Sequence, residues 1–352
     1  MIPMTLRFGR TSFPGVISGA PVAFSLRSTE GVGALSGFRS SRAATSFSPA
    51  TAVRAAYGRE IRAVKIGIVS KKDTYWSTRQ LLQAVERQGH QPSYIRTDAV
   101  RLVVAGHDDA QYNGASIRDH AIFIPRIGRS LTDFGKMLLR QLELMDLKTT
   151  LSSEALITAR NKFLALQSLR EADVPIPRSI LLASRPDVLE AAHFVHYPAI
   201  LKILSGTQGI GVMRVKSYEE TASIVDTMKS FGQVMLLQEY IPNPGIDIRA
   251  FVVGDRVIGS MKRVAQMHEW RSNIHLGAKG VSIELDDHAQ EVAVRASKAV
   301  GLEISGVDMI FRGDEPVVLE VNASPGFRGL LQATKINAAD AMVEYAAAKA
   351  SS

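Results

Sequence analysis

Two short apolar runs, each followed by a helix-like segment, mark the first part of the chain. The run VKIGIVS at 64–70 is almost wholly apolar, which is typical of a buried strand. Leu81, Leu82 and Val85 then recur at the spacing of one helix face, and Gly89 stands where a helix C-terminal cap is expected. This pattern predicts a strand followed by an amphipathic helix.

The same alternation occurs once more before residue 150. AIFIPRIG at 121–128 predicts a second strand that stops at Pro125, and 133–146 predicts a second helix. Strands that alternate with helices predict a small parallel sheet. No G-x-G-x-x-G follows the first strand, so the fingerprint of a dinucleotide-binding site is missing.

The second part of the chain has a different pattern, in which strands come in pairs around tight turns. Helices are predicted over 153–173, 217–230, 286–301 and 337–349. Strands are predicted over 197–204 and 234–241, and as two-stranded hairpins over 248–264 and 304–322. The chain is therefore predicted to combine an α/β N-terminal domain with an α+β second domain.

The strand VVLEVN at 317–322 carries two oxygen-bearing side chains in an otherwise apolar run. Side chains two apart on a strand share one face, so Glu320 and Asn322 point the same way. Asp308 lies in the partner strand of the hairpin and can face them. Two carboxylates and an amide oxygen are ligands that Mg²⁺ accepts, so we expect a metal site here. A carboxylate–arginine pair at a strand end would also explain either acid alone.

A glycine loop, GTQGIG at 206–211, follows the strand that carries Lys202. Glycines let backbone N–H groups approach phosphate oxygens closely, and a nearby lysine adds positive charge. The loop is not a Walker A sequence, and glycine-rich hairpin turns are common, so it is a weak signal alone. Combined with the metal site, it predicts that a Mg-nucleotide binds between two lobes.

Several charged residues lie in or just after the strands of the second part. Arg249, Arg263 and Arg271 could bind a phosphate and an acidic substrate, although three surface ion pairs would explain them equally well. Lys162 would ordinarily be a solvated helix lysine. Glu239 ends another strand, where it is either a plain surface residue or a border of a base pocket.

The positive charge of the chain is concentrated at its N-terminus. Residues 1–63 contain eight arginines and two glutamates, which account for +6 of the net charge of +8. The nearly neutral remainder has no footprint for a phosphate backbone, so we expect no direct nucleic-acid binding. The Ser-, Ala- and Arg-rich composition of 1–63 fits a disordered extension, an organelle transit peptide or a start codon assigned too far upstream.

Two absences from the sequence narrow the class of protein. The chain has no cysteine, which excludes disulfides, thiolate catalysis and cysteine-bound metal centres. No apolar run approaches the roughly 18 to 20 residues of a membrane span. We therefore expect a cytoplasmic protein without a membrane partner, or an organellar one if 1–63 is a genuine transit peptide.

The order of these signals along the chain is itself informative. Lys162, Lys202, GTQGIG, QEYI, DIRAFVVGD, WRSN, GVDMI and EVNASPG together resemble the ATP-grasp superfamily, and within it the RimK-type carboxylate–amine ligases. The resemblance covers 64–347 and leaves 1–63 outside. It implies an α/β pre-ATP-grasp domain at 64–150 and an α+β ATP-grasp domain at 151–349, whose two lobes clamp Mg-ATP. A lid subdomain is implied at about 190–235.

The resemblance also implies roles for single residues. Nucleotide contacts are implied for Lys162, Lys202, Gly206, Gln208, Gly209, Gly211, Glu239, Tyr240, Asp247, Arg271, Ser272 and Asn273. Two Mg²⁺ or Mn²⁺ ions would be held by Asp308, Glu320 and Asn322. Arg249, Arg263 and Arg271 would lie near the transferred phosphate or the substrate carboxylates.

The implied reaction joins a carboxylate to an amine in two steps. The carboxylate attacks the γ-phosphate of ATP to give an acyl phosphate and ADP, and the amine then displaces phosphate. By resemblance the amine is L-glutamate, and the acceptor is the C-terminal glutamate of a ribosomal protein or a glutamyl tail on a coenzyme. RimK-type proteins are often tetramers, so the resemblance allows a homo-oligomer.

One departure from the family pattern leaves the acceptor open. Leu276 stands where RimK-type sequences often have an arginine, and Lys279 follows shortly after. Alternative functions are a ligase acting on an amino-group carrier protein in lysine or arginine biosynthesis, a non-catalytic ATP-binding regulator, and a basic RNA-binding protein directed to ribosomes by 1–63. No expected metal ligand or phosphate lysine is missing, which favours an active ligase.

Overall fold

The computed structural model describes residues 62–204, 206, 211–243, 245–265 and 279–352. The expectations for 1–63 therefore lie outside the described residues, apart from Arg62 and Ala63. The same holds for the expectations placed on Gln208, Gly209, Arg271, Ser272, Asn273 and Leu276. In the part of the chain that is described, no helix is long and apolar enough to cross a membrane.

The first sheet is parallel, as the strand–helix alternation predicts. Its strands are β1 (Lys65–Ser70), β2 (Gln91–Arg96) and β6 (Ile122–Arg126), in the order β2-β1-β6. Helix α2 (Trp76–Arg87) connects β1 to β2 and buries Leu81 and Val85. Gly89 follows the helix with φ at +77°, a conformation that glycine adopts without strain.

The expectation that the second strand stops at Pro125 is wrong. Strand β6 continues through Arg126, and Pro125 stands opposite Val69 of β1. Because β6 is an edge strand of this sheet, a residue without an N–H can be accommodated there. This extension matters because it places Arg126 at the carboxyl end of the parallel sheet.

A small antiparallel sheet follows, which the hydrophobic pattern did not predict. Its strands are β3 (Arg101–Ala105), β4 (His107–Tyr112) and β5 (Ala115–Ser116). Helix α3 (Thr132–Leu144) holds it through Gln141, whose Nε2 donates to the Val103 carbonyl at 3.1 Å. Strand β4 reads HDDAQY, and a strand this polar gives no apolar period to detect.

The single helix predicted over 153–173 is two helices, so that prediction is wrong. Helix α4 spans Ser153–Arg160 and α5 spans Lys162–Glu171. Asn161 separates them in an extended conformation, with φ −105° and ψ 110°. Its side chain accepts from the backbone N–H groups of Phe163 and Leu164 and so caps α5. Lys162 therefore begins a helix instead of lying in the middle of one.

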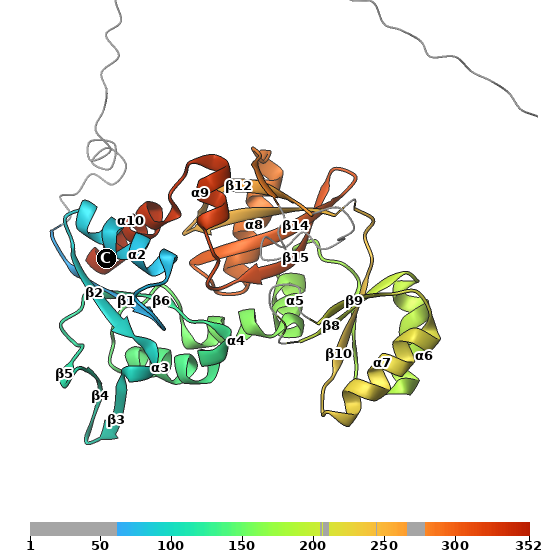
Figure 1. Ribbon diagram of the computed structural model, residues 1–352, viewed down its shortest axis with the longest axis horizontal. Coiled ribbons are helices and arrows are strands. Elements are labelled where there is room, and N and C mark those ends of the chain that lie inside the picture. The colour runs from blue at the N-terminus through green and yellow to red at the C-terminus, as the bar shows by residue number, and fades with distance from the viewer. Residues whose placement is uncertain (1–61, 205, 207–210, 244, 266–278) are drawn as a thin grey trace, which may run out of the picture. The chain divides into compact units, whose positions relative to one another are not determined.

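An antiparallel sheet with its own core follows the helix pair. It contains β7 (Ser179–Leu182), β8 (Ala199–Ile203), β9 (Val212–Val215) and β10 (Met235–Glu239), in the order β7-β10-β8-β9. Helices α6 (Arg185–Val195) and α7 (Tyr218–Ser230) lie side by side against it (Figure 1). Leu182, Leu201 and Leu237 of the sheet pack with Val188 and Val225 of these helices.

The largest sheet holds the two predicted hairpins. Its strands are β11 (Ile246–Val253), β12 (Arg256–Val264), β13 (Lys279–Ser282), β14 (Ile304–Arg312) and β15 (Glu315–Asn322). They follow the order β13-β12-β11-β14-β15, with all neighbours antiparallel. Helix α8 (Asp287–Ala299) packs on this sheet, and α9 (Arg328–Thr334) contacts β12 and β13. The predicted α+β character of the second part is confirmed.

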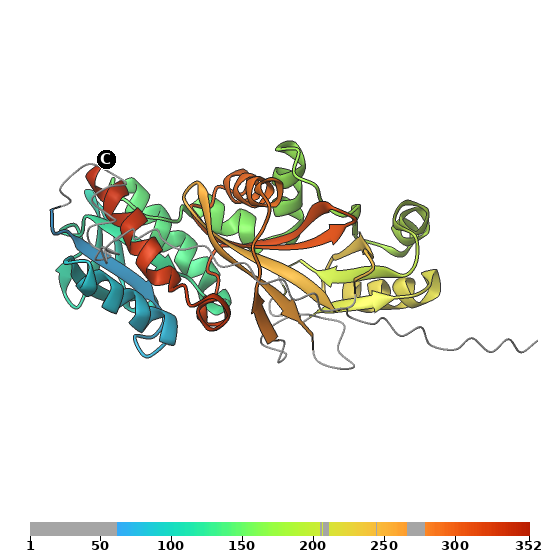
Figure 2. The same ribbon diagram turned by 90° about the horizontal axis from the view of Figure 1, so that it is seen from above.

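The last helix returns to the first part of the chain. Helix α10 (Ala338–Ser351), red, lies beside α2, blue, in both views (Figures 1 and 2). Met342 and Ala346 share a core with Leu81 and Val85. Arg87 also donates to the Asp340 carboxylate at 2.5 Å. Residues far apart in the sequence therefore stabilise the first sheet together.

Candidate active site

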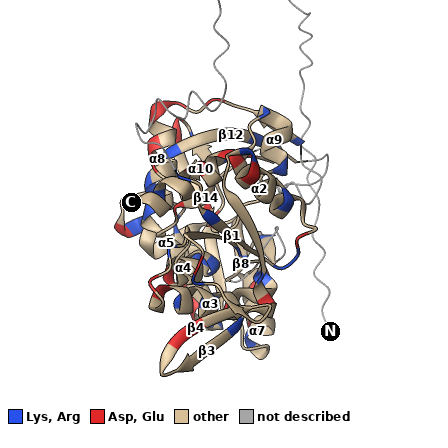
Figure 3. Ribbon diagram, turned by 90° about the vertical axis from the view of Figure 1, so that its left-hand side faces the viewer, with Lys and Arg blue, Asp and Glu red and all other residues tan. Residues whose placement is uncertain are grey.

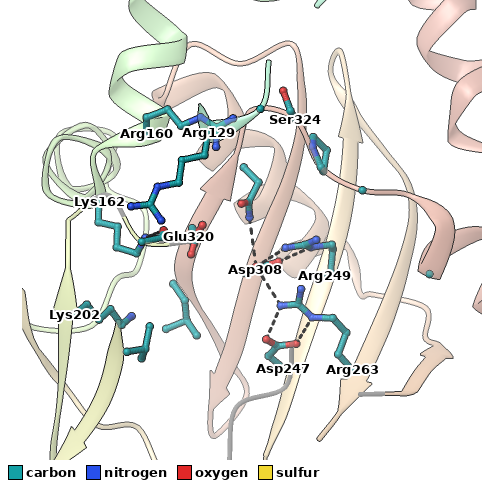
Figure 4. Close-up of a pocket in the computed structure, with 18 of the residues that line it drawn as sticks. Arg129, Arg160, Lys162, Lys202, Asp247, Arg249, Arg263, Asp308, Glu320 and Ser324 are labelled. Carbon is teal, nitrogen blue, oxygen red and sulfur yellow. Dashed lines mark hydrogen bonds and ion pairs between the residues drawn. The ribbon is translucent and has the colours of Figure 1, made fainter. Parts of the chain in front are cut away.

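A cleft of about 730 Å³ opens where the three larger sheets approach one another. Ser70 and Arg126 line it from the carboxyl ends of the parallel strands, Lys202 and Gln238 from the sheet of β7–β10, and Asp308 from the largest sheet. Figure 4 shows lysines, arginines and carboxylates pointing into this space. Ligands of α/β proteins characteristically bind at carboxyl ends of strands, so the cleft is the candidate site.

Buried ion pairs occupy the floor of the cleft. Arg249 donates from Nε and Nη2 to the two oxygens of Asp308, both at 2.7 Å. Arg263 donates to both oxygens of Asp247, and its Nη2 also lies 3.1 Å from Asp308 Oδ2. These pairs, shown by dashed lines in Figure 4, arise because the residues stand opposite one another in β11, β12 and β14. The structure thus pairs both arginines with aspartates.

Burial makes these pairs electrostatically strong. Arg263 is only 2% exposed and Asp308 only 7%. Burial by itself raises the pKa of Asp308, but Arg249 and Arg263 outweigh it and hold that pKa below the usual range. Burial also lowers the pKa of Arg263, and Asp308 and Asp247 reverse this effect and raise it. Asp308 and Arg263 therefore stabilise each other's charged form, and Arg249 and Asp247 add to this network.

The three expected metal ligands lie close together. Asp308 stands opposite Glu320 in the β14–β15 pair, and Asn322 follows two residues later on the same face. In the orientation that satisfies its neighbours, the Asn322 amide donates to Glu320 Oε1 at 3.0 Å and accepts from Arg249 Nη2 at 3.2 Å. Two carboxylates and an amide oxygen form a donor set that suits Mg²⁺. The residues present therefore fit the metal. The Asp308 carboxylate would bind the metal and its two arginine partners together.

Two lysines reach the cleft from another side. Lys162 Nζ donates to the Gly206 carbonyl at 2.6 Å, and Lys202 Nζ donates to Gln238 Oε1 at 2.5 Å. Burial lowers the pKa of Lys202 to about 8, while Glu320 raises it and Lys162 lowers it further. A phosphate beside Lys202 would offset the cost of burying its charge.

Gly211, at the end of the glycine loop, needs to be a glycine. Its φ is +74°, and a Cβ there would lie 2.5 Å from two carbon atoms of Ile203. The Gly211 carbonyl accepts from Ile203 N at 3.0 Å, which closes the turn between β8 and β9. The position of the Ile203 side chain over Gly211 therefore depends on the absence of a Cβ there.

Glu239 and Tyr240 differ in their relation to the cleft. Glu239 lines it, but its carboxylate accepts from Arg178 N and Nε and from Arg312 Nη2. Burial raises the pKa of Glu239, and these donors outweigh it and lower that pKa. Tyr240 is not among the lining residues, and Arg214 lies over its ring at 5.8 Å from the centroid.

Four further arginines of the cleft were not singled out from the sequence, and one of them, Arg328, lies over the Trp76 ring at 5.7 Å from the centroid. Arg126 ends β6, Arg129 lies in the 3₁₀ turn Arg129–Leu131, and Arg160 ends α4. Arg129 and Arg160 lie beside Lys162 and Glu320 in Figure 4. A signal for Arg126 was available, because it stands at the carboxyl end of a parallel strand. Arg160 had no such signal, because the break at Asn161 was not foreseen.

The charges on the rest of the described chain are mixed. Figure 3 shows acidic and basic residues on the same elements, without a stripe of one sign. Such a distribution agrees with the near neutrality of the sequence after residue 63.

Two family models match consecutive parts of the chain. The model of the RimK PreATP-grasp domain matches residues 64–156, and the model of the RimK-like ATP-grasp domain matches residues 159–346. The second match alone covers more than half of the chain. Both agree with the family expected from the sequence.

Relatives with curated names cover most of the chain. A probable alpha-L-glutamate ligase of Rhodopirellula baltica is 38% identical over 289 residues, which are 81% of this chain and 71% of the relative. A protein of the same name from Legionella pneumophila (strain Corby) is 36% identical over 291 residues, which are 82% of this chain and 96% of the relative.

Solved structures with the same fold are also known, although their sequences are distant. The ATP-grasp ligase PsnB complexed with its minimal precursor is 20% identical, with a TM-score of 0.66 over 83% of this chain and all of that one. An ATP-grasp RimK domain protein of Sphaerobacter thermophilus is 19% identical, with a TM-score of 0.61 over 80% of this chain and 99% of that one. Cleft, family models and relatives agree: the chain belongs to the RimK-like ATP-grasp family and is an ATP-grasp ligase that forms carbon–nitrogen bonds.

Proposed function

We propose that this ligase uses ATP to join the amine of L-glutamate to a carboxylate of an anionic acceptor. The acceptor would be the C-terminal glutamate of a ribosomal protein or a glutamyl group on a coenzyme. The name shared by the relatives supports the donor, and a PsnB structure complexed with the precursor peptide PsnA2 supports a peptide-like acceptor. The observation that carries the proposal is the convergence of Lys162, Lys202 and Glu320 on one cleft.

In this proposal each side of the cleft has its own task. Lys162 and Lys202 bind the phosphates of ATP, which orients the γ-phosphate toward the acceptor. One or two Mg²⁺ ions would be held by Asp308, Glu320 and Asn322. Bound Mg²⁺ would neutralise the negative charge that develops on the phosphates. Arg249 and Arg263 keep Asp308 ionised and fixed in direction, and so act as positioning residues.

The chemistry then needs no side-chain nucleophile. The acceptor carboxylate attacks the γ-phosphorus, the bond to the ADP oxygen breaks, and an acyl phosphate forms. The glutamate amine, once deprotonated, attacks the acyl carbon and phosphate leaves. An acyl phosphate is hydrolysed by water, so a cleft closed by the protein around it protects the intermediate.

The experiment is an assay of product mass with the full chain. The protein would be incubated with Mg-ATP, L-glutamate and a panel of peptides and coenzymes that end in glutamate. We expect one acceptor to gain a glutamyl residue with release of one ADP. Glu320→Gln should reduce the rate at least about a hundredfold, because it removes a metal-binding charge without touching the Asp308 ion pairs.

Other outcomes would replace the proposal. ADP without a glutamyl product would show that the donor or acceptor is different, and an amino-group carrier protein would be tested next. ATP binding without ADP under any pairing would favour a regulatory protein.

A further inference from the structure

Apart from Arg328, which lies over the Trp76 ring, the arginines of the cleft form two groups that differ in how their charge is balanced. Arg249 and Arg263 are matched by Asp308 and Asp247. Among the described residues, none of the ion pairs involves Arg126, Arg129 or Arg160. These three residues are called the arginine cluster below. Its positive charge lies in the cleft without a direct ion pair to a carboxylate of the described residues, of which only the more distant Glu320 acts electrostatically on Arg160.

Backbone groups hold two members of the arginine cluster in place. Arg126 Nη2 donates to the Pro325 carbonyl at 2.7 Å, and Arg160 Nη2 donates to the Ile127 carbonyl at 2.5 Å. Neutral carbonyls orient a guanidinium but do not neutralise it. Both side chains are therefore fixed in direction, and these bonds leave their charge free to attract an anion.

Buried donors in the arginine cluster also lack partners. Nε of Arg126 and Nε of Arg160 are buried without a hydrogen-bond partner among the described residues, and so is Oγ of Ser324 beside them. Burial, together with Arg160, lowers the pKa of Arg126 to about 10. Burial also lowers the pKa of Arg160, while Glu320 raises it and Arg129 lowers it further. Buried donors without partners and closely spaced positive charges are both unfavourable, and a bound anion would relieve both.

Two members of the arginine cluster, Arg129 and Arg160, border a side pocket of about 240 Å³. Lys162, Glu320 and Asn322 also line this pocket. A ligand in the side pocket can therefore reach the cluster with one end and the place of phosphate transfer with the other. A substrate with two negative groups close together fits this layout.

We infer that the arginine cluster binds the carboxylates at the reacting end of the acceptor and so selects acceptors that end in a dicarboxylic residue. This inference rests on the proposed function, since it names the residues that recognise the acceptor. One carboxylate lies toward Glu320 and Lys162, where it meets the γ-phosphate. The other is held by the planar guanidinium forks, which match carboxylate geometry with two parallel hydrogen bonds.

Two observations favour the acceptor over the nucleotide as the partner of the arginine cluster. Lys162 and Lys202 already supply cationic groups for the phosphates. Arg126 and Arg129 come instead from the segment that matches the PreATP-grasp family model. A phosphate or the free glutamate donor could use the same chemistry, so the experiment separates these sources.

The test is peptide binding to the full chain saturated with Mg-ADP, which avoids turnover. The probes are the tetrapeptide Ala-Ala-Glu-Glu with a free C-terminus and the uncharged peptide Ala-Ala-Gln-Gln with an amidated C-terminus. We expect the wild type to bind the first peptide and not the second. Arg160→Gln and Arg129→Gln should each weaken binding at least about tenfold, with the Mg-ADP affinity unchanged within about twofold.

Arg170→Gln is the matched control. Arg170, on α5, forms an exposed ion pair with Asp173 and does not line the cleft. Its substitution should therefore leave peptide binding unchanged. Arg129 is exposed, so loss of folding cannot explain an effect of Arg129→Gln. Measuring Mg-ADP affinity in every variant shows in addition that the nucleotide site is intact.

Several results would overturn the inference. These are unchanged peptide affinity in Arg129→Gln and Arg160→Gln, loss of Mg-ADP affinity instead, weaker binding of free L-glutamate only, or no binding of either peptide to the wild type. Because binding is measured without turnover, failure of the ligase assay leaves this test valid. Conversely, a glutamyl product made by both variants at unchanged acceptor KM would support the proposed function and overturn the inference.

Discussion

Arg249 stands directly opposite Asp308 in neighbouring strands, and its guanidinium meets the Asp308 carboxylate through two hydrogen bonds of 2.7 Å. Arg263 lies 3.1 Å from the same carboxylate and is bound to Asp247 as well. A residue expected to bind metal is therefore also the centre of a buried charge network. This double role separates Asp308 from Glu320, which has no such network.

The first prediction follows from this difference. Asp308→Ala should lower the free energy of unfolding by about 3–5 kcal/mol, because it leaves Arg249 without its counter-charge and removes one of the two carboxylates beside the buried Arg263. Glu320→Gln should change it by less than about 1 kcal/mol, since the half-buried Glu320 takes no part in the described ion pairs. Urea unfolding of both variants measures the contrast. Equal midpoints would show that the network does not stabilise the fold.

The second prediction concerns Gly211, where a side chain would meet Ile203. Gly211→Ala should destabilise the protein by about 2–4 kcal/mol, from the left-handed backbone and the forced contact together. Gly232 is the control, because its φ is +67° and a Cβ there would meet nothing within 4 Å. Gly232→Ala should therefore cost only about 1–2 kcal/mol. If the two variants unfold at the same urea concentration, the Ile203 contact is relieved without cost.

The sequence predicted those parts of the fold that depend on hydrophobic periodicity and on the order of elements along the chain. The β14–β15 hairpin was foreseen because its two apolar strands flank a tight Gly-Asp turn, and alternation then sets Asp308, Glu320 and Asn322 on one face. The parallel sheet was foreseen from strand–helix alternation. Strand β4 and the break at Asn161 were missed, because each depends on contacts and capping bonds that leave no hydrophobic period.

The site was predictable only in part, because pairing depends on three-dimensional neighbours. Arg249 and Arg263 were expected beside substrate groups, yet register places aspartates opposite both of them. Arg160 is an ordinary arginine in its own segment, and Arg126 was passed over because its strand was expected to end one residue earlier. Their shared location appears only when β6 and α4 are brought to one cleft.

The third prediction is a pH dependence of nucleotide binding. Burial lowers the pKa of Lys202 to about 8 from its ordinary value of 10.5, so the free protein loses this proton as pH rises through 8. A bound phosphate favours the charged amine and raises that pKa again, so binding is coupled to keeping the proton. The affinity for Mg-ADP should therefore fall as pH rises above about 8, by at most about tenfold per pH unit.

The check is calorimetric titration of Mg-ADP between pH 7 and 9.5 for the wild type and Lys202→Met. The variant should bind more weakly at pH 7 and show no inflection near 8, because the titrating amine is gone. An inflection of the same size in Lys202→Met would assign the pH dependence to another group.

The fourth prediction concerns the cap that separates α4 from α5. Asn161→Ala removes the oxygen that accepts from Phe163 N and Leu164 N, so it should lower the free energy of unfolding by about 1 kcal/mol. Alanine also favours a continuous helix across the break, which would move Lys162 away from the Gly206 carbonyl. We therefore expect the Kd for Mg-ADP to rise at least about fivefold in addition to the loss of stability.

Ser152→Ala provides the comparison, since Ser152 caps α4 by accepting from Ala155 N and does not line the cleft. Ser152→Ala should also lower the free energy of unfolding by about 1 kcal/mol, and it should leave the Kd for Mg-ADP unchanged. Urea unfolding and nucleotide titration on both variants separate the two effects of the cap. If Asn161→Ala lost stability but kept its affinity, the position of Lys162 would not depend on the helix break, and the turn at Asn161 would serve only the fold.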